Sequence, residues 1–284
     1  MKKALFAAAL LVIAAIGSVP ALAQSTNPPP LDHFRCYYIP NQIAFTPNIQ
    51  LQDQFDAAVS STTFEHIAQL TLARICNTTQ KLINNVTTPM TNPNHHLAMY
   101  QLSPQPITPR IVVVTNQFTP STGQTLMVSD ARFLLVPSGK IPLPGTQPDP
   151  SPDLDHYKCY AAGGPQLNVL PFLTDEFITE RTFVLWPVLF CNPTVKIHTN
   201  VTTNIQNNRD HLTCYATVGT GFAGIVNPPG VGIRNQFGTV GVPVMQPDMF
   251  CVPSIKVSWS VVVPPPSTSS SATKTAKPAG GNLM

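Results

Sequence analysis

Each of four histidines follows a residue that could assist it in chemistry. Three follow an aspartate and one follows another histidine; the pairs are Asp32-His33, His95-His96, Asp155-His156 and Asp210-His211. An aspartate beside a histidine suits acid–base catalysis, and neighbouring histidines suit metal binding. Catalysis requires one asymmetric arrangement, whereas this setting occurs four times. We therefore interpret the histidines as structural and expect no catalytic residue, no metal site and no cofactor.

Two further patterns are weaker candidates for a site. Adjacent residues of a strand point to opposite faces, so one metal ion would rarely reach both His95 and His96. Residues 219–224 match the Gly-x-Gly-x-x-Gly pattern of dinucleotide-binding loops. The following stretch, 225–230, contains Asn-Pro-Pro-Gly and cannot start the helix that such a loop requires. We interpret this segment as a flexible loop.

The histidines belong to a signature that occurs four times along the chain. It reads His-x-x-Cys-Tyr, then Asp/Asn-Gln/Glu-Phe, then Cys-x-Pro-Ser/Thr-x-Lys. The opening motifs begin at His33, His96, His156 and His211, the middle motifs at Asp53, Asn116, Asp175 and Asn235, and the closing motifs end at Lys81, Lys140, Lys196 and Lys256. The first copy departs at Thr78, where the others have proline. We number the copies one to four in chain order.

The cysteines indicate how the copies are stabilised. The second copy lacks both of its cysteines and has Met99 and Leu135 instead, whereas every other copy keeps both. Joint loss predicts pairing within each copy, and apolar replacements predict that the bonds lie in the core. Six cysteines alone would allow 15 connectivities. The predicted disulfides are Cys36–Cys76, Cys159–Cys191 and Cys214–Cys251.

The predicted fold is all-β, with two tandem, disulfide-pinned domains of β-sandwich or barrel-like form. Alternation around each opening motif indicates a half-buried strand, with Phe34 and Cys36 on one face and Tyr37 on the other. A proline-rich linker, 144–151, separates copies two and three. It predicts a first domain over 30–143 and a second over 152–262, each built from two units of roughly 55–63 residues. Residues 63–73 stay ambiguous between helix and strand.

Composition and the two ends of the chain favour an exported protein. Charged residues make up only 10% of the chain, which contains 31 prolines. Residues 1–23 resemble a bacterial signal peptide: two lysines, an apolar stretch, and Ala21-Leu22-Ala23 as the cleavage site. Oxidised cysteines agree with a secreted or periplasmic location. No other segment has the apolar length of a transmembrane helix, and residues 263–284 are expected to be a disordered tail.

Net charge argues against nucleic acid as a partner. The formal charge of +3 falls to −1 once Lys2 and Lys3 of the signal and Lys274 and Lys277 of the tail are set aside. Nucleic-acid binding requires a basic surface, and the remaining chain shows none.

Several phrases of the chain resemble a family of uncharacterised exported bacterial domains that occur in tandem. The phrases are Leu-Asp-His-Tyr-Lys-Cys-Tyr, Phe-Cys-Asn-Pro, His-Leu-Thr-Cys-Tyr, Asn-Gln-Phe-Gly and Phe-Cys-Val-Pro-Ser-Ile-Lys. The resemblance covers both predicted domains and is more specific in the second. It implies secretion and a domain of unknown function, with no established activity.

Two functional hypotheses follow. The first is a non-enzymatic structural or binding module of the cell envelope or extracellular space, with an unknown protein or glycan partner. Its candidate ligand contacts are Tyr37, Tyr100, Tyr160 and Tyr215, which equally well could cover the sheet. The alternative is an envelope hydrolase or carbohydrate-active enzyme with a cleft between the domains, using Asp175, Glu176 and His156 or His211. We favour the first, because four equivalent units suit a repeated scaffold.

Overall fold

The computed structural model describes residues 31–142, 148–220 and 230–262. Within these ranges the elements are β-strands, apart from the four-residue helix α1 (Gln54–Ala57). This confirms the all-β prediction. The predicted signal peptide (1–23), the first half of the predicted linker (144–147) and the predicted tail (263–284) lie outside the described residues.

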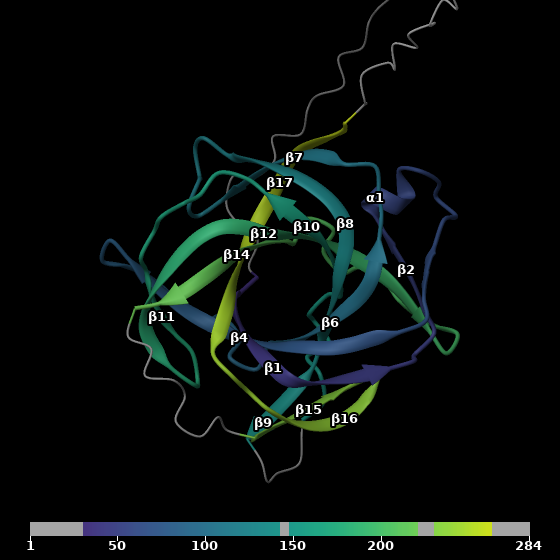
Figure 1. The fold of residues 1–284 in the computed structure, drawn as a ribbon, viewed down its shortest axis with the longest axis horizontal. Helices are drawn as coiled ribbons and strands as arrows, with labels where there is room; N and C mark the ends of the chain where they lie inside the picture. The colour runs from purple at the N-terminus through teal and green to yellow at the C-terminus, as the bar shows by residue number, and fades with distance from the viewer. Residues whose placement is uncertain (1–30, 143–147, 221–229, 263–284) are drawn as a thin grey trace, which may run out of the picture.

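Eight long strands form one closed, antiparallel ring, which Figure 1 shows end-on. Each copy contributes its opening strand and its closing strand, and the copies follow one another around the ring. The order is β1–β4–β6–β8–β10–β12–β14–β17 and back to β1. The opening strands are β1 (His33–Phe45), β6 (His96–Gln105), β10 (Tyr157–Gly163) and β14 (His211–Gly219). The closing strands are β4 (Leu70–Ile83), β8 (Gln124–Pro137), β12 (Thr179–His198) and β17 (Pro247–Val261).

The two predicted domains are not separate sheets. Strand β8 of the first half pairs with β10 of the second, and β1 pairs with β17, so two ladders join the halves. A half on its own would leave the outer edges of β1 and β8 without hydrogen-bond partners. Closing the ring pairs these backbone groups and removes the exposed edges. The prediction of two tandem domains over 30–143 and 152–262 is therefore corrected to one closed ring.

The middle motifs lie at the ends of four outer strands, and each outer strand pairs with the closing strand of the copy two further on. These strands are β2 (Ile49–Asp53), β7 (Arg110–Asn116), β11 (Phe172–Thr174) and β15 (Gly230–Asn235). Strand β2 pairs with β12, β7 with β17 and β11 with β4; β15 pairs with β9 (Gly139–Pro142), which continues the second copy after β8. The closing strands are long because one end builds the ring and the other holds an outer strand.

Short strands complete the described chain. They are β3 (Glu65–Ile67), β5 (Val86–Thr88), β13 (Val201–Thr203) and β16 (Gly238–Pro243). The hairpins β4–β5 and β12–β13 turn through Asn84-Asn85 and Thr199-Asn200, all with φ between 48° and 64°. Positive φ at both central residues is what a two-residue hairpin turn of the common type requires. The ambiguous stretch 63–73 contains β3 and the start of β4, so it is strand and not helix.

The inside of the ring holds the disulfides. The bonds are Cys36–Cys76, Cys159–Cys191 and Cys214–Cys251, the predicted pairs, and each joins residues that face each other across neighbouring strands. Met99 faces Leu135 at the equivalent place in copy two. All eight side chains belong to one buried cluster, completed by residues such as Phe34 and Leu212. The cross-links span 40, 32 and 37 residues, for which chain entropy suggests about 3–4 kcal/mol each.

A second core lies between the ring and the outer strands. It contains Tyr37, Tyr100 and Tyr160 of the opening motifs together with Leu51 and Phe55 of the first outer strand and its helix. The opening strands are therefore buried on both faces where they carry the motif, and residues 31–37 are all buried. This corrects the prediction of half-buried strands: the alternation of Cys and Tyr separates two cores, and not a core from solvent.

Candidate functional site

The four recurring tyrosines do not face a ligand. Each is at most 1% exposed, and its hydroxyl bonds to the first residue of the middle motif two copies away. The pairs are Tyr37–Asp175 (2.6 Å), Tyr160–Asp53 (2.9 Å), Tyr100–Asn235 (2.9 Å) and Tyr215–Asn116 (2.9 Å). The prediction of ligand contacts is thus corrected: these rings anchor the outer strands to the ring.

The rest of the middle motif completes the same contact. The Asp or Asn side chain accepts a hydrogen bond from the backbone N–H of the motif phenylalanine, at 2.8–3.0 Å in all four copies. That phenylalanine then lies edge-on against the tyrosine, with ring centroids 5.0 Å apart for Tyr37–Phe177 and 5.2 Å for Tyr100–Phe237. Edge-on contact is a favoured aromatic geometry. Tyrosine, Asp/Asn and phenylalanine therefore form one repeated lock.

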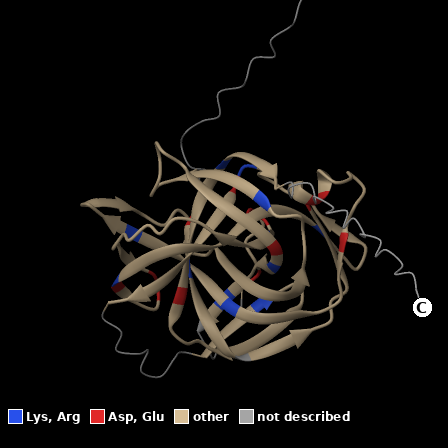
Figure 2. Cartoon of the chain, turned by 45° about the horizontal axis from the view of Figure 1, so that its top comes forward, with Lys and Arg blue, Asp and Glu red and all other residues tan. Residues whose placement is uncertain are grey.

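Charge decides whether the lock carries Asp or Asn. The residue between the motif histidine and cysteine, two positions before the tyrosine, is Arg35 in copy one and Lys158 in copy three, but Ala98 and Thr213 in the other two. Charged residues are sparse along the strands, as Figure 2 shows. The two cations belong to the copies whose tyrosines meet aspartate, and the neutral residues to those whose tyrosines meet asparagine. A buried carboxylate is costly without a partner, so cation and aspartate occur together.

In the two charged locks, additional acidic side chains contact the cation. Arg35 is fully buried, lies 3.8 Å from Asp175, and contacts the Glu180 carboxylate directly. Lys158 donates to Asp56 at 3.0 Å and also contacts Glu65. Burial raises the pKa of Asp175, although Arg35 and the Tyr37 hydroxyl oppose this rise. In these ion pairs, acidic residues of copies one and three stabilise the fold.

Histidine, lysine and the Gln/Glu of the middle motif form a second repeated contact, between neighbouring copies. The amide of Gln117 lies between His33 and Lys81, and that of Gln236 between His156 and Lys196. In copy two, Lys140 forms an ion pair with Glu176. In copy four, the Gln54 amide nitrogen lies 3.5 Å from His211 Nε2. Each middle motif therefore binds two other copies, through its first and second residues.

Burial keeps these histidines neutral. It lowers the pKa of His33 to about 4 and those of His96 and His156 to about 3, and the nearby lysine lowers each further. Burial also lowers the pKa values of Lys81, Lys140 and Lys196 to about 8. A neutral imidazole has one donor and one acceptor nitrogen. His33 can therefore accept from the Gln117 amide nitrogen, and His156 can donate to the Gln236 amide oxygen.

Among the described residues, no hydrogen bond or ion pair joins the aspartate and histidine that are neighbours in an opening motif, such as Asp32 and His33. Asp32 accepts backbone N–H bonds from Thr91 and Asn92 at 2.5 and 2.8 Å, and Asp155 does the same from residues 206 and 207 at 2.8 and 2.9 Å. These aspartates tie the loop before one copy to the loop before the next. Within the described residues, no group of three or more His, Cys, Asp or Glu is arranged to hold a metal ion.

The residues of the hydrolase hypothesis are not brought together. Asp175 bonds to Tyr37, Glu176 to Lys140, and His156 to Gln236, three separate contacts. The cleft between domains, on which the hypothesis rested, does not form among the described strands, because the halves share one ring. Of the Gly-x-Gly-x-x-Gly stretch, Gly219 ends β14, and residues 221–224 lie outside the described ranges.

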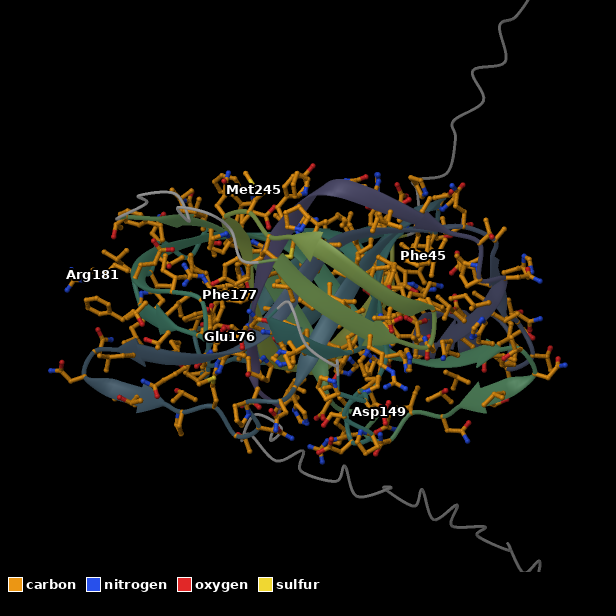
Figure 3. The ribbon with its side chains drawn as sticks, turned by 90° about the horizontal axis from the view of Figure 1, so that it is seen from below. Phe45, Asp149, Glu176, Phe177, Arg181 and Met245 are labelled. Carbon is orange, nitrogen blue, oxygen red and sulfur yellow. A yellow bond between two sulfur atoms is a disulfide. The ribbon has the colours of Figure 1, made fainter. Side chains whose placement is uncertain are left out.

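A pocket of about 420 Å³ opens at one end of the ring. We call it the mouth pocket. Seen from the side, the ring axis is vertical in Figure 3; Met245, just before β17, lies at the upper end and Asp149 at the lower end. The mouth pocket is lined from seven of the eight ring strands by Arg74, Gln101, Arg132, Phe133, Ala161, Val188, Leu189, Ala216, Asp248 and Met249.

The mouth pocket combines an apolar floor with a fixed polar rim. Leu189 and Met249 are buried and belong to the disulfide cluster, and Phe133 packs against it. On the rim, Arg74 binds Asp248 through two nitrogens, at 2.9 Å from Nε and 2.6 Å from the terminal nitrogen. Two parallel hydrogen bonds hold this pair in one orientation.

All ten lining residues come from three positions of the repeat. The position two before the second cysteine holds Arg74, Phe133, Leu189 and Met249. The position three before it supplies Arg132, Val188 and Asp248, and the position after the tyrosine supplies Gln101, Ala161 and Ala216. No two copies carry the same residue at the first two positions, whereas the buried signature recurs. The mouth pocket is therefore where the repeat becomes asymmetric.

Sequence reasoning missed this pocket, because it searched for residues that recur. The signal was the opposite one: the positions two and three before the second cysteine of the signature, whose residues differ in every copy.

One family model matches the chain. It is described as a repeat of unknown function (DUF7450), and it matches residues 103–222. The match starts near the end of β6, covers the middle and closing motifs of copy two and all of copy three, and ends after β14. It agrees in part with the predicted resemblance to an uncharacterised repeat domain. No curated protein and no solved structure matches the chain.

Proposed function

We propose that the protein is a non-enzymatic binding module whose closed ring presents the mouth pocket to a partner. The observation that carries this proposal is that recurring and variable positions of the repeat lie in different places. The recurring residues that could catalyse a reaction or bind a ligand are buried in contacts that hold the ring and outer strands together. Positions that vary among the copies, most of them exposed or half-buried, gather instead around one pocket, at the end of a closed sheet where ligands commonly bind.

The lining of the mouth pocket supports a compact apolar group as its occupant. Its volume of about 420 Å³ falls within the range of small-ligand sites. Phe133, Leu189 and Met249 offer apolar and aromatic surface, which suits the face of a sugar ring or an apolar side chain. Arg132 on the rim is exposed and can orient a polar group. A glycan or a protein segment is the partner class we favour, and not nucleic acid.

We also propose that the protein works in the periplasm or outside the cell, as an exported bacterial protein. Three disulfides support this location, because such bonds persist in oxidising compartments. No helix among the described residues has the length and apolar character needed to cross a membrane. The predicted signal peptide is in keeping with export.

A binding screen with a matched pair of variants tests the proposal. We expect the mature chain to bind a member of a glycan or peptide array, and Phe133→Ala to weaken that binding about tenfold, the effect of removing an aromatic anchor. Phe172→Ala is the control, because Phe172 is a 39% exposed residue outside the mouth pocket. Equal loss in both variants would contradict the mouth pocket as the site. Hydrolysis of an arrayed glycan would favour the enzyme hypothesis instead.

A further inference from the structure

One of the four contacts between histidine, lysine and the Gln/Glu of the middle motif is more open than the others. Lys81, Lys140 and Lys196 are 3%, 6% and 3% exposed, whereas Lys256 is only half-buried. Lys256 and His211 line a second pocket of about 180 Å³, completed by Gln54, Asn208, Arg209 and Ile255. At about 30 Å³ per water, this volume equals roughly six water molecules.

The open contact has a different hydrogen-bond pattern from its equivalents. In copies one and three, the lysine donates to the amide oxygen of the next copy's glutamine. In copy four, Lys256 donates to Asn192 Oδ1 at 3.0 Å, and the Gln54 amide nitrogen donates to the same oxygen at 3.1 Å. Lysine and glutamine thus share one acceptor and do not bond to each other.

The second pocket carries positive charge without a negative partner. Its lining contains Lys256 and Arg209 and no carboxylate. Among the ion pairs of the described residues, neither cation has an acidic partner within 4 Å. Arg209 is exposed at the pocket's rim, so its side chain is free to reorient toward a ligand.

Burial disfavours the charged forms of Lys256 and His211. Burial lowers the pKa of Lys256 to about 7; Asp53 opposes this shift and Arg110 adds to it. Burial, and then Lys256, lowers the pKa of His211. A bound anion would favour the charged form of both groups.

We propose that this second pocket binds a small oxyanion of the phosphate or sulfate type. Two cations and the amides of Gln54 and Asn208 surround a space of suitable size, and charge-assisted hydrogen bonds to such donors are strong. The site is separate from the mouth pocket: His211 and Ala216, which line one pocket each, are five residues apart along β14, about 17 Å. This inference therefore does not depend on the proposed function.

Calorimetric titration of the mature chain at pH 6.5 tests the proposal. We expect saturable, one-to-one binding of inorganic phosphate and of sulfate, with acetate weaker because it offers fewer oxygens to the surrounding donors. A parallel titration with glycerol 3-phosphate distinguishes a phosphomonoester ligand from the free ion. Binding as tight as that of inorganic phosphate indicates a phosphomonoester, and no binding of glycerol 3-phosphate indicates the free ion. Added phosphate should also raise the pKa of His211, observed by NMR. No saturable binding of any of these anions would overturn the proposal.

Matched variants locate the site. Lys256→Met and Arg209→Gln should each weaken phosphate binding about tenfold or more, the effect of losing one charge-assisted hydrogen bond. Arg181→Gln is the control, since Arg181 is also exposed and lies outside the pocket. Arg209→Gln alters an exposed side chain, so the test holds even if Lys256→Met does not fold. Unchanged binding in Arg209→Gln together with unchanged binding in a folded Lys256→Met, or equal loss in Arg181→Gln, would overturn the proposal.

Discussion

Single residues of the signature are matched to residues of other copies. The tyrosine of one copy meets the Asp or Asn of the copy two further on, and the histidine, the lysine or both meet the Gln or Glu of the next copy. Arg35 and Lys158 occur where the partner is aspartate, and neutral residues occur where it is asparagine. The Asp or Asn of a middle motif is therefore not interchangeable between copies, because it matches the charge of the residue it meets in the opposite copy.

This matching predicts the effect of removing one charge. Arg35→Thr should lower the free energy of unfolding by about 3–5 kcal/mol, because Asp175 and Glu180 would remain buried without a cation. Adding Asp175→Asn and Glu180→Gln should recover a large part of this loss, since Thr213 with Asn116 shows that the lock tolerates a neutral set. Urea unfolding of the single, double and triple variants measures this. Purely additive losses would contradict the matching.

Elements in this protein serve two layers at once. The closing strand β12 runs for 20 residues, pairing with β10 and β14 in the ring and with β2 outside it. The cysteines fall within the ring part, so each disulfide fixes an opening strand to a closing strand at one register. In copy two, packing of Met99 against Leu135 replaces the bond.

A fourth disulfide should therefore form between β6 and β8. Met99 and Leu135 face each other in the register that the cysteines have in the other copies, so Met99→Cys with Leu135→Cys places two sulfurs in reach. A loop of this size suggests about 3–4 kcal/mol of stabilisation, less the packing lost with the two side chains. Mass spectrometry of non-reduced peptides and thermal unfolding measure it. The single Met99→Cys variant is the control, and two free thiols in the double variant would refute the equivalence.

The whole molecule is one ring because neither half satisfies its own strand edges. In the first half, residues 31–142, strands β1 and β8 lie at the two edges of the sheet. The second half supplies their partners, β17 for β1 and β10 for β8. Closure also brings the four copies around one axis. The inside can then be filled by disulfides, and the mouth pocket forms from equivalent positions of several copies.

Separated halves test the closed ring. We expect chains 24–143 and 152–262 to be unstable as monomers and to associate when mixed, because association pairs the exposed edges of β1 and β8. Since the copies are equivalent, a half can also complete a ring with a second copy of itself. Size-exclusion chromatography gives the oligomeric state of each sample, and the chemical-shift dispersion of its NMR spectrum shows whether it is folded. A well-folded monomer from either half would restore the two-domain arrangement.

The sequence by itself determined the unit of this protein. Strand alternation predicted the all-β class, and the joint loss of two cysteines in copy two predicted all three disulfide pairs, because both signals are local to one copy. The same local view placed a domain boundary in the proline-rich linker, where strands of the two halves pair across it. It also left Tyr37 and its equivalents open between ligand contact and sheet cover, and the outer strands bury them.

Only the tertiary structure decided how the copies fit together. Whether a tyrosine, lysine or histidine is buried depends on residues one or two copies away, and no spacing along the chain encodes that choice. The mouth pocket likewise arises from positions outside the recurring signature, which a search for recurring motifs passes over. The physical reason is that a strand edge binds any complementary edge, so ring closure, and not the sequence of one copy, fixes the partners.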